Sequence, residues 1–175
     1  VYWNSAQGGL EIQFDANTSG TAGQDSFYWV KASAAITKGQ LCYFTGVVGA
    51  SSAVTAAPAI AGITNPTYIM GFAAESIPLN SFGYIQFLGT LKGFDTSAFT
   101  LGSILYYDSI NGNVTATYPA TGPIVQVAAV TYSGTGGSGS VLIRVSVQQR
   151  MLAGTAISVS QSASGITVNN TGVTS

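Results

Sequence analysis

The chain contains two related stretches, and this internal repeat limits its fold more than any other feature of the sequence. Residues 38–44 are KGQLCYF, and residues 101–107 are LGSILYY. Gly39 and Gly102 hold the same place in the two copies, and an apolar run follows each of them. Each copy therefore predicts a glycine turn that leads into a β-strand.

The similarity continues beyond these strands. In both halves three further segments follow in the same order: VTAAP, IMGFAA and GYIQF at residues 54–58, 69–74 and 83–87, then VTATYP, IVQVAA and GSVLI at residues 114–119, 124–129 and 139–143. This order indicates two diverged copies of one four-strand unit. Two copies are too few for a solenoid, so we expect the halves to complete each other's core.

The body of the chain is predicted to be all-β, an antiparallel β-barrel or sandwich built from the two pseudo-repeats. Residues 141–147 alternate between apolar and polar side chains, which is typical of a strand with one buried face. Between residues 27 and 147, glycine and β-branched residues interrupt every stretch in which an amphipathic helix would have to run.

Three segments are expected along the chain. Residues 1–24 predict a β-hairpin (strands at 1–4 and 10–14) and a polar linker, and residues 25–150 predict the body, with pseudo-repeats at about 38–89 and 101–147. Residues 151–175, rich in Ser, Thr and Gly, predict a connecting or oligomerising stalk. Its short alternating pieces suit strands that pair with neighbouring subunits. Because the pattern stops abruptly at the end, we expect a piece of a longer polypeptide.

The charge content argues against nucleic-acid and membrane binding. Charged residues make up only 6% of the chain and the formal net charge is −1. The five cations are scattered along the sequence: Lys31, Lys38, Lys92, Arg144 and Arg150. Such a distribution builds neither a phosphate-binding face nor a polybasic membrane anchor. The most apolar stretch, residues 47–63, is too short and too weakly apolar to span a bilayer.

Several kinds of active site are excluded by residue type. The chain has no histidine and one cysteine, Cys42, which removes Ser-His-Asp and Cys-His catalysis and the usual zinc sites. Cys42 lies in an apolar segment and is predicted to be a core residue. The glycine-rich run at residues 134–139 lacks the Lys and the helix of a phosphate-binding loop. No cofactor or metal is therefore expected.

The remaining catalytic candidates are carboxylates. Asp95 and Asp108, or Glu75 with either of them, could form the carboxylate pair of a glycosidase. Asp95 is followed by Thr-Ser and Asp108 stands just before an Asn-Gly hairpin turn, so both fit turn chemistry better. We therefore expect no enzymatic activity.

Aromatic residues offer a second kind of candidate site, because sugars stack on exposed rings. Tyr106, Tyr107 and Asp108 are the candidate glycan contacts, and Trp3, Trp29 and Tyr43 are further stacking candidates. On alternating strands about half of such rings face the core.

Several motifs together resemble a β-rich module of tailed-bacteriophage virion proteins, notably tail fibres and related appendages. They are YWNS with LEI at residues 2–12, ITKGQ at 36–40, GFDTSAFTLGSILYYD at 93–108 and GNVTATYP at 112–119. The resemblance covers roughly residues 2–148. It identifies a structural module, and no catalytic residues follow from it.

The resemblance implies a homotrimeric, non-enzymatic part of a virion, located on the exterior of the particle. Its expected partners are further copies of itself, other virion proteins and, if it assists attachment, a host surface glycan. Two alternatives stay open. One is a capsid decoration, head-fibre or cement protein, and the other is a spike that binds or degrades glycans.

Overall fold

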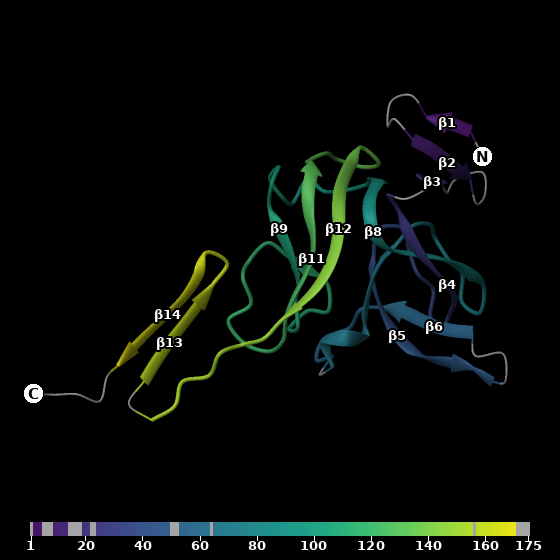
Figure 1. Cartoon of the computed structure of the whole chain (residues 1–175). Helices are drawn as coiled ribbons and strands as arrows, with labels where there is room; N and C mark the ends of the chain where they lie inside the picture. The colour runs from purple at the N-terminus through teal and green to yellow at the C-terminus, as the bar shows by residue number, and fades with distance from the viewer. Residues whose placement is uncertain are drawn as a thin grey trace, which may run out of the picture.

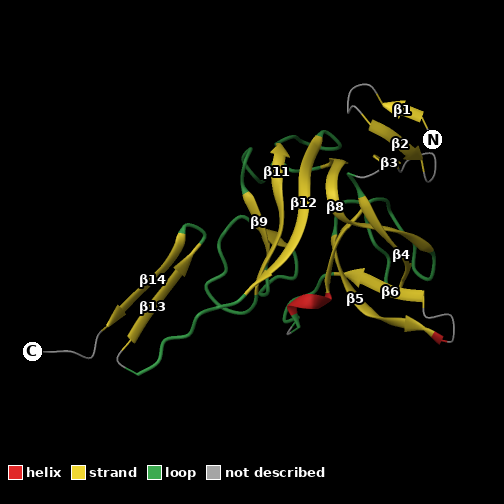
Figure 2. Ribbon diagram, in the orientation of Figure 1, coloured by secondary structure: helices red, strands yellow, loops and turns green. Residues whose placement is uncertain are grey.

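The computed structural model describes residues 2–4, 9–13, 19–21, 24–49, 53–63, 65–155 and 157–170. The predicted all-β class is confirmed: strands carry nearly all of the regular structure, and helix is limited to short 3-10 turns such as η2 (Pro66–Tyr68) (Figure 2). The strands form three separate sheets of three, nine and two strands. Within the described residues, no helix has the length and apolar character needed to cross a membrane.

The N-terminal segment forms a three-stranded antiparallel meander. Its strands are β1 (Tyr2–Asn4), β2 (Gly9–Gln13) and β3 (Ser19–Thr21), in the order β1-β2-β3. The first two strands are those of the predicted hairpin. The third lies where the sequence predicted a linker, because the free edge of β2 pairs with residues 19–21.

Five strands close into a β-barrel. They are β4 (Ser26–Ala32), β5 (Leu41–Val48), β6 (Ala53–Pro58), β7 (Ile69–Ala73) and the first half of β8 (Phe82–Phe94). Around the barrel the order is β8-β4-β6-β5-β7, and β7 pairs back onto β8 through Phe72↔Gln86 and Ala73↔Ile85. This last pairing closes the sheet on itself.

One strand pair departs from the predicted antiparallel arrangement. β4 and β6 run parallel, with Lys31 opposite Thr55 and Ala32 opposite Ala56. The other four neighbours in the barrel are antiparallel. A closed ring with an odd number of strands cannot alternate direction throughout, so one parallel pair is unavoidable.

The second half of β8 continues into an open sheet. Its partners, in spatial order, are β12 (Gly139–Gln148), β11 (Ile124–Tyr132), β9 (Ile104–Tyr107) and β10 (Val114–Thr115). β8 is 13 residues long, which allows it to belong to both the barrel and this sheet (Figure 1). The long strand therefore ties the two halves of the body together.

Two hydrophobic clusters fill the body. The first receives a residue from every barrel strand and lies inside the barrel: Val30, Cys42, Ala56, Met70 and Ile85 are among its members. The second lies between the outer wall of the barrel and the open sheet, where Phe72 packs with residues of β9, β11 and β12. β7 therefore contributes to both cores: Met70 and Ala73 belong to the first cluster, and Ile69 and Phe72 belong to the second.

The burial of the repeated positions can be compared directly. Ile85 and Val141 are both fully buried, and so are Cys42 and Leu105, at 0% and 1% exposure. Leu41 is buried while Ile104 is only half-buried. The prediction that Cys42 is a core residue is confirmed.

The C-terminal strands form a separate antiparallel hairpin. Among the described strands, β13 (Ile157–Ser162) and β14 (Gly165–Asn170) pair only with each other, and an extended segment, residues 149–155, leads toward them from β12. The hairpin stands clear of the body (Figure 1). Gln161 holds it to the extended segment, because its side chain accepts from Met151 N at 3.1 Å and donates to Gln149 O at 3.1 Å.

Candidate functional site

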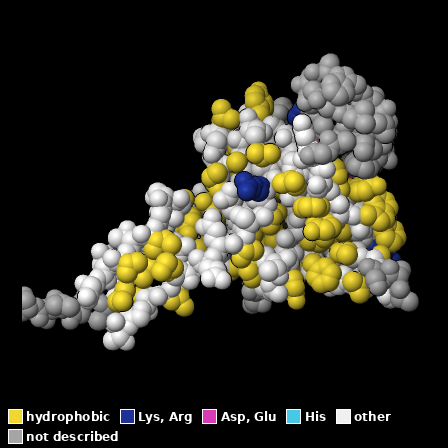
Figure 3. All heavy atoms as spheres, in the orientation of Figure 1, with side chains coloured by type: hydrophobic (Ala, Val, Ile, Leu, Met, Phe, Trp, Pro, Cys, Tyr) yellow, Lys and Arg dark blue, Asp and Glu magenta, His cyan; other side chains and the backbone are white. Residues whose placement is uncertain are grey.

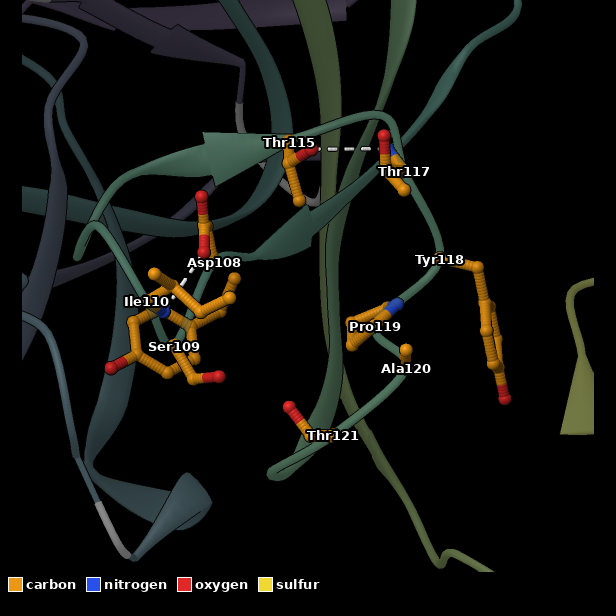
Figure 4. Close-up of a pocket in the computed structure, with 10 residues that line it drawn as sticks. Asp108, Ser109, Ile110, Thr115, Thr117, Tyr118, Pro119, Ala120 and Thr121 are labelled. Carbon is orange, nitrogen blue, oxygen red and sulfur yellow. Dashed lines mark hydrogen bonds between the residues drawn. The ribbon is translucent and has the colours of Figure 1, made fainter.

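The predicted glycan contacts lie beside a hollow at the end of β9. The hollow measures about 320 Å³ and lies between the β9–β10 turn and the loop that follows β10. Its lining is rich in hydroxyl groups: Tyr107, Asp108, Ser109, Ile110, Thr115, Thr117, Tyr118, Pro119, Ala120 and Thr121 (Figure 4). Of the three predicted contacts, Tyr107 and Asp108 line it and Tyr106 does not.

Asp108 builds the turn on one side of the hollow. Its Oδ1 accepts hydrogen bonds from the backbone N–H groups of Ile110 and Asn111, at 2.9 and 3.2 Å, and its Oδ2 accepts from Asn111 Nδ2 at 2.7 Å. These bonds, led by the one from the Asn111 side chain, lower the pKa of the Asp108 carboxyl below its usual value. Asp108 therefore stays ionised and is held in place by its own turn.

Tyr107 and Tyr106 are core residues. Tyr107 is fully buried, and its hydroxyl donates to Ile60 O at 2.7 Å and accepts from Ile63 N at 3.0 Å. Tyr106 is 3% exposed and meets Tyr118 edge-on, with ring centroids 5.4 Å apart. Burial raises the pKa of both phenols. In this structure neither ring offers an exposed face on which a sugar could stack.

The loop after β10 forms the other wall, and the sequence analysis did not name it as part of a candidate site. The Arg150 guanidinium clamps it, with Nη2 donating to Pro119 O at 2.7 Å and Nε donating to Gly122 O at 3.3 Å. The Tyr118 hydroxyl is buried and has no hydrogen-bond partner among the described residues. In Figure 4 the Tyr118 ring points away from Asp108, so this hydroxyl is no part of a shared constellation with the carboxylate.

The three candidate carboxylates have structural roles. Asp95 Oδ1 accepts from Ser97 N at 2.9 Å and from Ser97 Oγ at 2.7 Å, as the predicted turn requires. The bond from the Ser97 hydroxyl is the main cause that lowers the pKa of Asp95. Glu75 Oε1 accepts from Tyr84 N at 2.9 Å. A glycosidase needs one carboxyl with a raised pKa as its acid, whereas those of Asp95 and Asp108 are lowered.

The other predicted stacking residues are spread over the molecule. Trp29 is 54% exposed and lies on the outside of the barrel, stacked on Phe82 at a centroid distance of 5.7 Å. Tyr43 is half-buried and packs against the core between the barrel and the open sheet. The side chain of Trp3 lies outside the described residues.

A second hollow has a more aromatic lining. It measures about 440 Å³ and is lined by aromatic rings from β4, β5, β8 and η2, namely Tyr28, Phe44, Phe87 and Tyr68. Sequence reasoning missed these four residues. Their strands were predicted, but which rings meet at one end of a barrel depends on its closure and register, for which a single sequence carries no local signal.

The described part of the chain contains no group of three or more metal-ligating side chains of the His, Cys, Asp and Glu types. Comparison with protein-family models finds no match, and comparison with curated proteins finds none either.

Proposed function

We propose that this chain is a structural component of a bacteriophage virion, of tail-fibre or appendage type, that assembles as a homotrimer and has no catalytic role. The motifs that resemble phage appendage modules suggest this class of protein. The structural observation that carries the proposal is the C-terminal hairpin. It is a piece of regular structure with an apolar face that the described body of the chain does not cover.

The hairpin has two chemically different faces. Directly paired residues point to the same side of a sheet, so the pairs Val159↔Val168, Gln161↔Ile166 and Ile157↔Asn170 share one face. The other face carries only Ser, Thr, Asn and Gly. Ile157, Ile166 and Val168 are 43%, 47% and 54% exposed. An isolated two-stranded hairpin is marginally stable in water, so a covered apolar face would stabilise this one.

Further copies of the same chain are the partner we infer for this face. The face carries no charge, and β13 and β14 each leave one edge unpaired among the described strands. Identical hairpins around a symmetry axis would cover one another's apolar faces and edges. The number three comes from the resemblance to appendage proteins.

We also infer that the body arose by duplication of one strand unit. Gly39 N donates to Ala73 O at 2.9 Å, and Gly102 N donates to Val130 O at 2.8 Å. In return, Ala73 N donates to Gln40 O and Val130 N donates to Ser103 O, both at 2.9 Å. β5 also pairs with β6 and β7, as β9 pairs with β10 and β11. Val130 lies two residues beyond Ala128, which the alignment of the two copies places opposite Ala73, so the strand pairing is shared while its register is shifted. The shared pairing supports the pseudo-repeat, in which the first unit closes into a barrel and the second stays an open sheet.

Location in the particle tests the proposal. Antibodies to the 175-residue chain, coupled to gold and applied to virions that carry it, should label the tail or its appendages in electron micrographs. Label confined to the capsid faces would overturn the appendage assignment and favour a decoration or cement protein, for which a compact barrel body is equally suitable. Absence of label from intact particles that bind a control antibody would contradict any location on the virion exterior.

A glycan-recognition role is the second candidate function. Two of the open hollows in the body favour it, one lined by hydroxyls and one by aromatic rings. We propose glycan binding as the form of this role, because Asp95 and Asp108 are both engaged by hydrogen bonds of their own turns.

A further inference from the structure

The mouth of the β-barrel contains a hollow to which every barrel strand contributes. Its lining includes Tyr28 of β4, Phe44 of β5, Val54 of β6, Met70 of β7 and Phe87 of β8, together with Tyr68 of η2. Barrel mouths are common places for small-molecule sites, and the volume of about 440 Å³ falls in the usual range of such sites.

Two aromatic pairs line this hollow. Tyr28 and Phe87 stack with centroids 4.4 Å apart and planes inclined by 29°, while Phe44 and Tyr68 meet edge-on at 5.7 Å. Tyr28 and Tyr68 are 42% and 43% exposed. In each pair the half-buried phenylalanine packs against the tyrosine, and part of the tyrosine ring remains exposed to a ligand. Figure 3 shows hydrophobic side chains gathered over the barrel part of the face in view.

The polar groups of the hollow are uncharged. Thr67 and the two tyrosines supply hydroxyls, and none of the described residues that line it carries a charge. Thr67 Oγ1 donates to Asn65 Oδ1 at 2.6 Å, so its lone pairs remain available to accept. The lining has no Lys or Arg to pair with an anionic ligand, and it has no Asp or Glu to pair with a cationic ligand. The chemistry that fits is a neutral molecule with an apolar face and hydroxyls at its edge.

We propose that the barrel mouth binds a neutral saccharide, with one pyranose ring stacked on Tyr68 or Tyr28 and its hydroxyls at Thr67 and the phenols. The C–H face of a pyranose matches an exposed aromatic ring, and its hydroxyls match neutral donors and acceptors. The inference rests on the glycan-recognition role and moves that role away from Tyr106 and Tyr107, which are buried.

Methionine methyl groups give a direct test in the intact chain. Of the two methionines, Met70 lines the hollow and Met151 lies in the extended segment after β12, so a chain labelled with ¹³C at the methionine methyl groups carries both a reporter and an internal control. Glucose, galactose, mannose and N-acetylglucosamine are titrated separately, with choline and N-acetylneuraminic acid as charged probes. We expect at least one neutral sugar to shift Met70 saturably at millimolar concentration and to leave Met151 unchanged.

Three variants show whether the rings carry the binding. Tyr68→Ala should weaken it by about fivefold or more, and Tyr68→Phe, which keeps the ring, by about twofold at most. Trp29→Ala removes a ring of similar exposure outside the hollow and should leave the affinity unchanged. Three results would overturn the proposal. The first is that no neutral sugar shifts Met70 saturably, and the second is that only choline or N-acetylneuraminic acid does so. The third is an equal loss of affinity in Trp29→Ala and Tyr68→Ala. The titration does not depend on oligomer mass or location, so its failure would leave the structural role standing.

Discussion

Cys42 combines complete burial with a thiol that the barrel interior keeps protonated. Its side chain is 0% exposed, and burial raises the pKa of the thiol from 9.0 to about 12. We expect native protein at pH 8 to resist labelling by a disulfide reagent such as dithionitrobenzoate, and protein in concentrated urea to react once per chain. Rapid labelling under native conditions would contradict the burial of Cys42.

The same thiol predicts the direction of a pH effect on stability. The unfolded chain loses the thiol proton near pH 9, whereas the folded chain holds it to about pH 12. The free energy of unfolding should therefore fall as pH rises between these values. Cys42→Ala should lose this component of the alkaline destabilisation. Urea unfolding at pH 8 and pH 10 measures the difference, and the smaller side chain should lower the free energy of unfolding by a similar amount at both pH values. An unchanged pH slope in the variant would refute the prediction.

Thr96 is a buried polar residue whose hydroxyl joins two loops. It is 1% exposed, and its Oγ1 donates to Tyr132 O at 2.8 Å and accepts from Gly134 N at 3.1 Å. Thr96→Val keeps the shape but leaves both backbone groups unpaired, so we expect a loss of about 1–3 kcal/mol in the free energy of unfolding. Thr96→Ser retains the hydroxyl and should lose less. Equal stability of the Val and Ser variants in urea would show that the hydrogen bonds contribute nothing.

At the scale of the strands, Gly71 of β7 lies directly against the backbone of β8. Its φ is 145°, and a Cβ placed there would collide with the carbonyl of Gln86. Backbone strain alone would cost Gly71→Ala about 1–2 kcal/mol in the free energy of unfolding. The collision should make the loss larger than that. Gly102→Ala is the matched control, because its φ is 82° but its Cβ would meet open space. Thermal unfolding of both variants, monitored by circular dichroism, compares their stabilities. An equal loss of stability in Gly71→Ala and Gly102→Ala would show that the collision contributes nothing.

Local sequence patterns predict strands well and their closure poorly. The alternation at residues 141–147 and the apolar runs near Cys42 and Leu105 correctly predicted strands, because a buried face demands a period of two. The parallel β4–β6 pair was missed, since it follows from the parity of a closed ring and from no local pattern. The burial of Tyr107 was unpredictable for a related reason: whether its ring faces the core or solvent depends on the pairing of β9.

At the scale of the whole molecule, we propose that the hairpin decides the state of assembly. If its apolar face holds the subunits together, light scattering at micromolar concentration should give a mass near three times 17.8 kDa. The double variant Ile166→Asn with Val168→Asn makes that face polar and should reduce the mass to one chain, because apolar burial is the main stabilising contribution in such contacts.

The opposite face of the hairpin provides the control. Ser160 and Thr167 are paired across β13 and β14, and both side chains are exposed on the polar face. Ser160→Asn with Thr167→Asn introduces the same amides at a face that would stay in water, so the mass should remain that of the assembly. Far-ultraviolet circular dichroism should keep its β-sheet signal in both double variants, because the hairpin stands apart from the barrel and open sheet (Figure 1). A wild-type mass of one chain would contradict self-assembly. If the variant with Ile166→Asn and Val168→Asn still assembles, the contact between subunits lies in the body and not in the hairpin.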